Sequence, residues 1–249
     1  MSARGQSETL SYVLVFSLVV ASTGLVYVGG YGGLQDAQQA EQLDNMGRAF
    51  DVLAANLADI HHRNAPSRGT EVYLSGGAIG FDAPVEITVR AVEVGNASNN
   101  ATFSMNPRPL VYSGQGDTTF VYVSGAVIRT DDEGGVMRIP PGFEVGDDRA
   151  VLSFVVTYPQ TDESFSGRSP VLIVGTNRGT GLDGSFTPSN DTAVSITVDS
   201  PRADIWSRYF DREGYTAIDS DASDGSVTYQ FTTERLYVYR SVIEFDLKR

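Results

Sequence analysis

The residues best suited to bind a metal ion form an acidic segment near the C-terminal end. Asp219, Asp221 and Asp224 alternate with small polar residues ahead of Gly225. Carboxylate oxygens at such spacing suit Ca²⁺, but the third Asp comes one place late for an EF-hand and no helix leads into the segment. We interpret it as a solvated acidic loop and predict no metal site, with a weak cation site as the alternative.

Residues for catalysis are not arranged in a recognisable motif. The chain has no Cys and no G-x-S-x-G sequence, and its only histidines, His61 and His62, are adjacent in a predicted helix. Successive helical residues point about 100° apart, so these two rings are poorly placed to share a ligand. The Gly-rich segment 175–181 lacks the Gly-Lys-Ser/Thr of a phosphate loop and is interpreted as a loop. The sequence therefore predicts neither an enzyme nor a cofactor, and a membrane-anchored hydrolase remains a remote alternative.

Three asparagines lie in N-x-S/T acceptor sequences for glycosylation. They are Asn96, Asn100 and Asn190. Each lies in a predicted loop, which is where a surface glycan must be attached. We expect glycans at these positions to shield loops and add solubility.

The charge balance is strongly acidic. Formal net charge is −13, and Lys248 is the only Lys among the 249 residues. Such a chain has no electrostatic basis for binding nucleic acid. Acidity with almost no Lys resembles secreted proteins of halophilic archaea, in which an acidic surface maintains solubility in concentrated salt.

An uncharged run near the N-terminus predicts a membrane helix. Leu10 to Tyr31 would span about 33 Å as a helix, enough to cross the hydrocarbon core of a bilayer. Arg4 precedes the run, whereas Asp36, Glu41 and Asp44 follow it. This asymmetry favours an N-terminus inside the cell and a C-terminal domain outside it. The run is too long for an ordinary cleaved secretory signal.

The five residues before this run carry a family resemblance. The sequence Arg4-Gly5-Gln6-Ser7-Glu8, placed directly before an uncharged helix, resembles the signal of archaeal type IV pilins and pilin-like proteins. The resemblance implies that a prepilin-type peptidase cuts between Gly5 and Gln6. It also implies that Glu8 pairs with the terminal amine of a neighbouring subunit, although Glu8 lies two residues nearer the cut than the glutamate of bacterial pilins. A plain membrane anchor is the alternative.

Two helical segments of different character are expected to follow the leader of residues 1–5. Residues 6–33 form the transmembrane helix, in which Gly29 and Gly33 make a small-xxx-small surface for close helix packing or a hinge. Residues 34–65 form an amphipathic helix that lays an apolar stripe on the following domain. The stripe consists of Leu43, Met46, Phe50, Leu53, Leu57 and Ile60.

From residue 70 to residue 249 the pattern predicts a β-rich domain. Short segments rich in Val, Ile, Thr, Phe and Tyr alternate with Gly, Asn, Asp and Pro clusters, which is typical of an antiparallel β-sandwich. One short helix, residues 203–213, is expected to bury Trp206, with carbohydrate stacking as the alternative role of this Trp. Residues 227–231 and 236–247 predict a final hairpin whose second strand is central to a sheet. The fold class is therefore α+β.

This order of elements resembles that of pilin-like exported proteins of haloarchaea. The resemblance implies a structural subunit of the cell surface, in the cell membrane with its C-terminal domain extracellular, or in a filament. Its partners would be membrane lipid, the prepilin-type peptidase and other pilin-like subunits. The alternative is a monomeric anchored β-sandwich that acts as a binding module.

Overall fold

The computed structural model describes residues 3–114 and 116–249, and their side chains except those of residues 3–9 and Val28. It begins with one long helix, α1 (Ala3–Arg63), which is followed by a β-rich domain. The chain divides into two compact units between Asp44 and Asn45, so α1 contributes its last five turns to the second unit.

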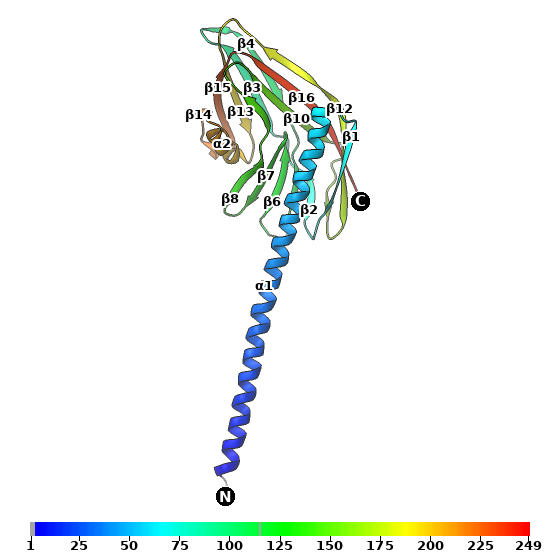
Figure 1. Cartoon of the computed structure of the whole chain (residues 1–249), viewed down its shortest axis with the longest axis vertical. Helices are drawn as coiled ribbons and strands as arrows, with labels where there is room; N and C mark the ends of the chain where they lie inside the picture. Colours follow the sequence, from blue (N-terminus) through cyan, green and yellow to red (C-terminus); the bar gives the residue numbers. More distant parts are fainter. Residues whose placement is uncertain (1–2, 115) are drawn as a thin grey trace. The chain divides into compact units, whose positions relative to one another are not determined.

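The strands of the second unit form three sheets (Figure 1). Sheet 1 has the order β1 (Ser67–Tyr73), β12 (Pro170–Phe186), β16 (Leu236–Lys248), β10 (Ala150–Pro159) and β9 (Gly142–Val145). Sheet 2 has the order β11 (Phe165–Ser166), β2 (Ala78–Phe81), β5 (Leu110–Ser113), β6 (Thr119–Val123), β7 (Ala126–Asp131) and β8 (Gly134–Ile139). Sheet 3 has the order β14 (Thr216–Asp219), β15 (Ser226–Thr233), β13 (Thr192–Asp199), β3 (Glu86–Glu93) and β4 (Asn96–Met105).

The predicted α+β class is confirmed, because a long N-terminal helix precedes a mostly antiparallel multi-sheet domain with one short α-helix, α2 (Ala203–Arg212). A single 3-10 turn, η1 (Ala222–Asp224), lies between β14 and β15. Among the described strands, β10 and β16 pair in parallel, from Ala150↔Leu236 to Pro159↔Phe245. The prediction that β16 is central to its sheet is also confirmed, since it lies between β12 and β10.

The predicted final hairpin is wrong. Strands β15 and β16 follow each other in sequence but belong to different sheets, β15 pairing with β13 and β14, and β16 with β12 and β10. The connection Glu234-Arg235 contains no Gly or Asn, the residues that a tight two-residue hairpin turn requires. The chain instead crosses from sheet 3 to sheet 1 at this point.

The two faces of strand β16 are buried along different parts of its length. Leu236 and Val238 belong to the main core, which also contains the buried face of α2 and the inner faces of β3 and β13. From Ser241 onward the opposite face is buried, with Ile243 and Phe245 fully covered. Because side chains alternate along a strand, Tyr237 and Tyr239 share the face of Ser241 and Ile243.

Helix α2 packs against this main core. Ile205, Trp206, Tyr209 and Phe210 are all buried, as the sequence predicts, and the indole ring of Trp206 is 0% exposed. A ring without exposed surface cannot stack on a carbohydrate, so the alternative role of Trp206 is wrong. The ring is packed beside Tyr209 and Phe210 instead.

The last turns of α1 dock on the β-domain through the predicted apolar stripe. Phe50, Leu57 and Ile60 are 0% exposed, and Met46 and Leu53 are nearly so. Gly175 makes this close approach possible, because a Cβ there would lie 2.7 Å from Leu57 Cδ2. The interpretation of segment 175–181 as a loop is wrong, because the segment lies inside β12. Its glycines fit a strand that passes beneath a helix and contains two bulges.

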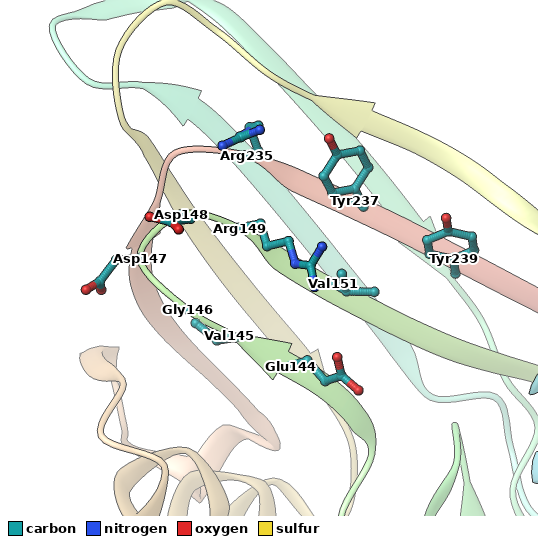
Figure 2. Close-up of a pocket in the computed structure, with 10 residues that line it drawn as sticks. All are labelled: Glu144, Val145, Gly146, Asp147, Asp148, Arg149, Val151, Arg235, Tyr237 and Tyr239. Carbon is teal, nitrogen blue, oxygen red and sulfur yellow. The ribbon is translucent and has the colours of Figure 1, made fainter.

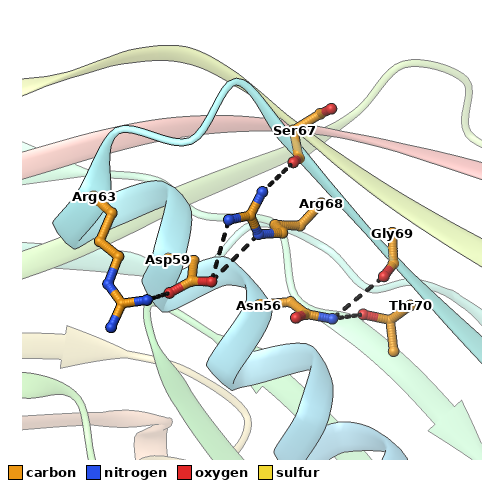
Figure 3. Close-up of polar contacts among 7 residues, drawn as sticks. All are labelled: Asn56, Asp59, Arg63, Ser67, Arg68, Gly69 and Thr70. Atoms are coloured by element: carbon orange, nitrogen blue, oxygen red, sulfur yellow. Dashed lines mark hydrogen bonds and ion pairs between the residues drawn. The ribbon is translucent and has the colours of Figure 1, made fainter.

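Polar contacts hold the end of the helix against β1 (Figure 3). Asn56 Nδ2 donates to Thr70 Oγ1 at 2.8 Å and to the carbonyl of Gly69 at 3.3 Å. Asp59 pairs with Arg68 at 3.3 Å. The helix ends at Arg63, and Asn64 adopts a left-handed conformation with φ of 53°. These contacts fix the register of the docked turns on sheet 1.

We expect Leu57→Ala to lower the free energy of unfolding of the β-domain by about 2–5 kcal/mol, because it removes a fully buried side chain and leaves a cavity over Gly175. Chemical denaturation of the full chain in detergent measures the change. Val52→Ala is the matched control, since Val52 lies on the same helix but is 52% exposed. Equal destabilisation by both variants would contradict the docking described here.

Candidate functional site

The N-terminal part of α1 carries an apolar surface that nothing in its own unit covers. Large apolar side chains between Leu10 and Tyr31 are 54–77% exposed. The helix contains an 18-residue window with mean hydropathy of 2.0, of which 0% is buried. By length and composition it is long and apolar enough to cross a membrane.

Two hydroxyl groups within this helix are hydrogen-bonded to its own backbone. Ser22 Oγ and Thr23 Oγ1 both donate to the carbonyl of Val19, at 3.0 and 2.8 Å. Such internal bonding is what hydrocarbon surroundings demand of a hydroxyl group. Tyr12 stacks on Phe16, and Tyr27 stacks on Tyr31. The aromatic pairs therefore lie near the two ends of the apolar run, the depth at which Tyr is enriched in membrane helices.

The glycines of this segment leave open space on the helix surface. A Cβ built on Gly29 or Gly33 would meet no atom of the chain within 4 Å. Both residues lie within continuous α-helix, one turn apart on the same face. The predicted cleavage residues Gly5 and Gln6, and the predicted assembly residue Glu8, have helical backbone, but their side chains lie outside the described part of the structure.

The predicted glycosylation residues are exposed, but two of the three are not in loops. Asn190 lies in the connection before β13, whereas Asn96 and Asn100 lie in β4. The loop expectation fails for these two because the chain reverses within Val94-Gly95, where Gly95 has φ of 85°. Strand β4 is the edge of sheet 3, so it still presents both side chains to solvent.

Glu93 brings two of these asparagines together, which sequence patterns did not reveal. Glu93 is 7% exposed, and its carboxylate accepts from Asn99 Nδ2 at 2.8 Å, and from Asn96 Nδ2 and Asn190 Nδ2 at 3.2 Å each. Hydrogen bonds from Asn99, and then from Asn190 and Asn96, lower the pKa of this carboxyl group. The cluster ties the β3–β4 hairpin to the connection before β13.

The acidic segment uses its carboxylates to fix its own backbone. Asp219, Asp221 and Asp224 each accept a hydrogen bond from the backbone N–H two residues ahead, at 2.9–3.1 Å. A hydrogen bond from the side chain of Ser223, and secondly the one from its backbone N–H, lower the pKa of Asp221. Within the described residues, no three Asp, Glu or His side chains come together in a way that could hold a metal ion.

The two histidines have different surroundings. His61 Nδ1 is 2.6 Å from Ser241 Oγ, which also contacts Thr180 Oγ1 at 2.9 Å. Ser241 is 0% exposed, between β12 and β10, so this Ser–His pair offers no hydroxyl to a substrate. A cavity of about 300 Å³, lined mainly by apolar groups, lies beside His61 under the docked helix. Burial, and secondly the charge of His62, lower the pKa of His61 to about 4.

This lowered pKa predicts a pH dependence of stability. Between pH 6.5 and 4 the unfolded chain takes up a proton at residue 61 that the folded chain refuses, so stability falls as the pH falls through this range. Because His61 is partly exposed, we expect a loss of about 1–2 kcal/mol. His61→Asn should flatten the dependence, measured as unfolding midpoints of the full chain at pH 7 and 4.5.

His62→Asn is the control, because His62 is exposed and supplies only the smaller cause of the shift. It should leave most of the pH dependence in place. A profile that His61→Asn does not alter would contradict the assignment.

An open groove of about 900 Å³ lies on sheet 1 beyond the end of the docked helix (Figure 2). Tyr237 and Tyr239 of β16 form its floor, and the connection from β9 to β10 forms one wall. No motif in the sequence marks this groove. The alternation of apolar and polar residues along 236–247 predicts a strand but not a groove.

The chain belongs to a family of unknown function, DUF7289, whose model matches residues 4–246. The match therefore includes both the N-terminal helix and the β-domain. No curated protein and no solved structure matches the chain.

Proposed function

We propose that this DUF7289 protein is a pilin-like subunit of the cell surface, anchored in the membrane by residues 6–33 with its β-domain outside the cell. The observation that carries the proposal is the uncovered apolar surface between Leu10 and Tyr31. Burying a Val, Leu or Phe side chain contributes about 1.5–3 kcal/mol, so a helix of this composition is strongly driven to leave water. Lipid provides that cover for a single subunit.

Neighbouring helices provide the same cover in an assembly. Gly29 and Gly33 present a surface without side chains, and the chain itself places nothing against it. Two helices that meet along such small residues gain backbone contact that bulkier side chains would prevent. This supports exchange of lipid for helix contacts when subunits gather into a filament.

The residues ahead of the helix support processing by a prepilin-type peptidase. A cut between Gly5 and Gln6 would remove only the short charged leader and keep the whole apolar run. Glu8 would then lie close to the new terminal amine, in position to pair with the amine of a neighbouring subunit. Opposite charges attract far more strongly near hydrocarbon than in water, so such a pair favours one axial stagger between subunits.

We expect native protein to begin at Gln6, and Gly5→Val to retain residues 1–5 while still sedimenting with membranes. The β-branched residue blocks the peptidase, but the apolar run that anchors the chain is unchanged. Intact-mass analysis of membrane-extracted protein distinguishes the two products. Ser2→Val, outside the motif, is the control and should be processed normally. A native chain that starts at Met1 or Ser2, or a shortened Gly5→Val product, would overturn the proposal.

A further inference from the structure

We propose that the groove over Tyr237 and Tyr239 binds a neutral oligosaccharide. For brevity we call it the tyrosine groove, defined by these two residues together with Glu144, Asp148, Arg149 and Arg235. The proposal goes beyond the anchored-subunit function and does not depend on processing after Gly5.

The tyrosine groove is the part of one face of sheet 1 that α1 leaves uncovered. Ser241 and Ile243, on the same face of β16, lie beneath the docked helix, where His61 contacts Ser241. Helix α1 ends at Arg63, and the next residues back along β16 on that face are Tyr239 and Tyr237. The groove therefore begins where the helix ends.

Strand register places the floor residues in two cross-strand rows. One row runs Glu144, Val151, Tyr237 and the other contains Ser153 and Tyr239. Figure 2 shows the two tyrosine rings standing side by side on β16, with Arg149 extending along the same face. Residues two apart on a strand have Cα atoms about 7 Å apart. Two flat rings at this spacing offer apolar surface to successive sugar rings of one chain.

The polar groups of the groove are not committed to the protein itself. Within the described part of the chain, the side chains of Glu144, Arg149, Tyr237 and Tyr239 have no hydrogen-bond or ion-pair partner. Arg235 makes one exposed contact, with Glu234 at 3.4 Å. Guanidinium donors, carboxylate acceptors and phenolic hydroxyls therefore surround the rings and remain available to a ligand.

The wall of the groove is held in place by backbone contacts. Gly146 N–H donates to the carbonyl of Arg149 at 3.0 Å, which closes the turn between β9 and β10. Glu234 N–H donates to the carbonyl of Asp147 at 2.8 Å, and Thr233 Oγ1 donates to that of Gly146 at 2.8 Å. A wall that is already ordered loses little entropy when a ligand binds.

The chemistry of the lining selects the class of ligand. Three acidic residues, Glu144, Asp147 and Asp148, line the same groove as Arg149 and Arg235, so a ligand of either charge would meet like charges. An apolar ligand would leave the charged walls without partners. A neutral oligosaccharide can bind both kinds of charged side chain, because its hydroxyl groups donate to carboxylates and accept from guanidinium groups. Its ring faces cover the tyrosines.

The test uses the full chain in a detergent without a sugar headgroup, titrated with neutral trisaccharides of glucose, mannose, galactose and N-acetylglucosamine. Saturation-transfer NMR detects binding, and calorimetry measures its affinity. At least one neutral trisaccharide should bind. Tyr237→Ala and Tyr239→Ala should each weaken its binding about tenfold. Arg149→Gln, which removes a side chain without an internal partner, should also weaken binding without altering the unfolding midpoint.

Tyr73→Ala is the matched control, because Tyr73 is an exposed tyrosine of β1 whose hydroxyl donates to the carbonyl of Arg168. It should bind as the unaltered chain does. Three results would each overturn the proposal: no neutral trisaccharide binds, only an acidic trisaccharide such as trigalacturonate binds, or binding survives all three groove substitutions.

Discussion

Helix α1 carries two apolar surfaces, and each needs a different cover. Between Met46 and Ile60 the cover is the β-domain, which buries the stripe completely and fixes it with Asn56 and Asp59. Between Leu10 and Tyr31 the chain supplies no cover within the helical unit. The C-terminal turns of α1 are thus a structural part of the β-domain, whereas its N-terminal turns expose an apolar surface.

Strand β16 links the docked helix to the groove that we propose as a sugar site. It is the only strand in the described chain that pairs with both β12 and β10, and its inner face changes from the main core to the helix-covered side. Because α1 ends at Arg63, the face it covers ends near Ser241, and Tyr239 and Tyr237 are left open. The length of one helix therefore sets both how far the domain is covered and where its groove begins.

Much of the fold could be predicted from the sequence because it depends on local periodicity. Spacings of three and four identified the stripe through Phe50 and Leu57, and the same pattern identified the face of α2 that buries Trp206. Long-range pairing could not be predicted in this way. Nothing local shows that β15 and β16 part into different sheets, or that Gly175 lies beneath Leu57. The tyrosine groove could not be predicted for the same reason, since Arg149 and Tyr237 are brought to one groove only by the parallel pairing of β10 with β16.

The central claim is that helices of neighbouring copies pack against the apolar segment Leu10–Tyr31 along the face that carries Gly29 and Gly33. The chain contains no Cys. A single introduced Cys can therefore form a disulfide only with the same Cys of another copy or with another protein. Gly29→Cys and Gly33→Cys lie on that face, whereas Tyr31→Cys lies about 200° from Gly29 around the helix. Under mild oxidation in native membranes, we predict disulfide-linked dimers for the first two variants and none for the third. No cross-linking at Gly29 and Gly33, or equal cross-linking at all three positions, would contradict the account.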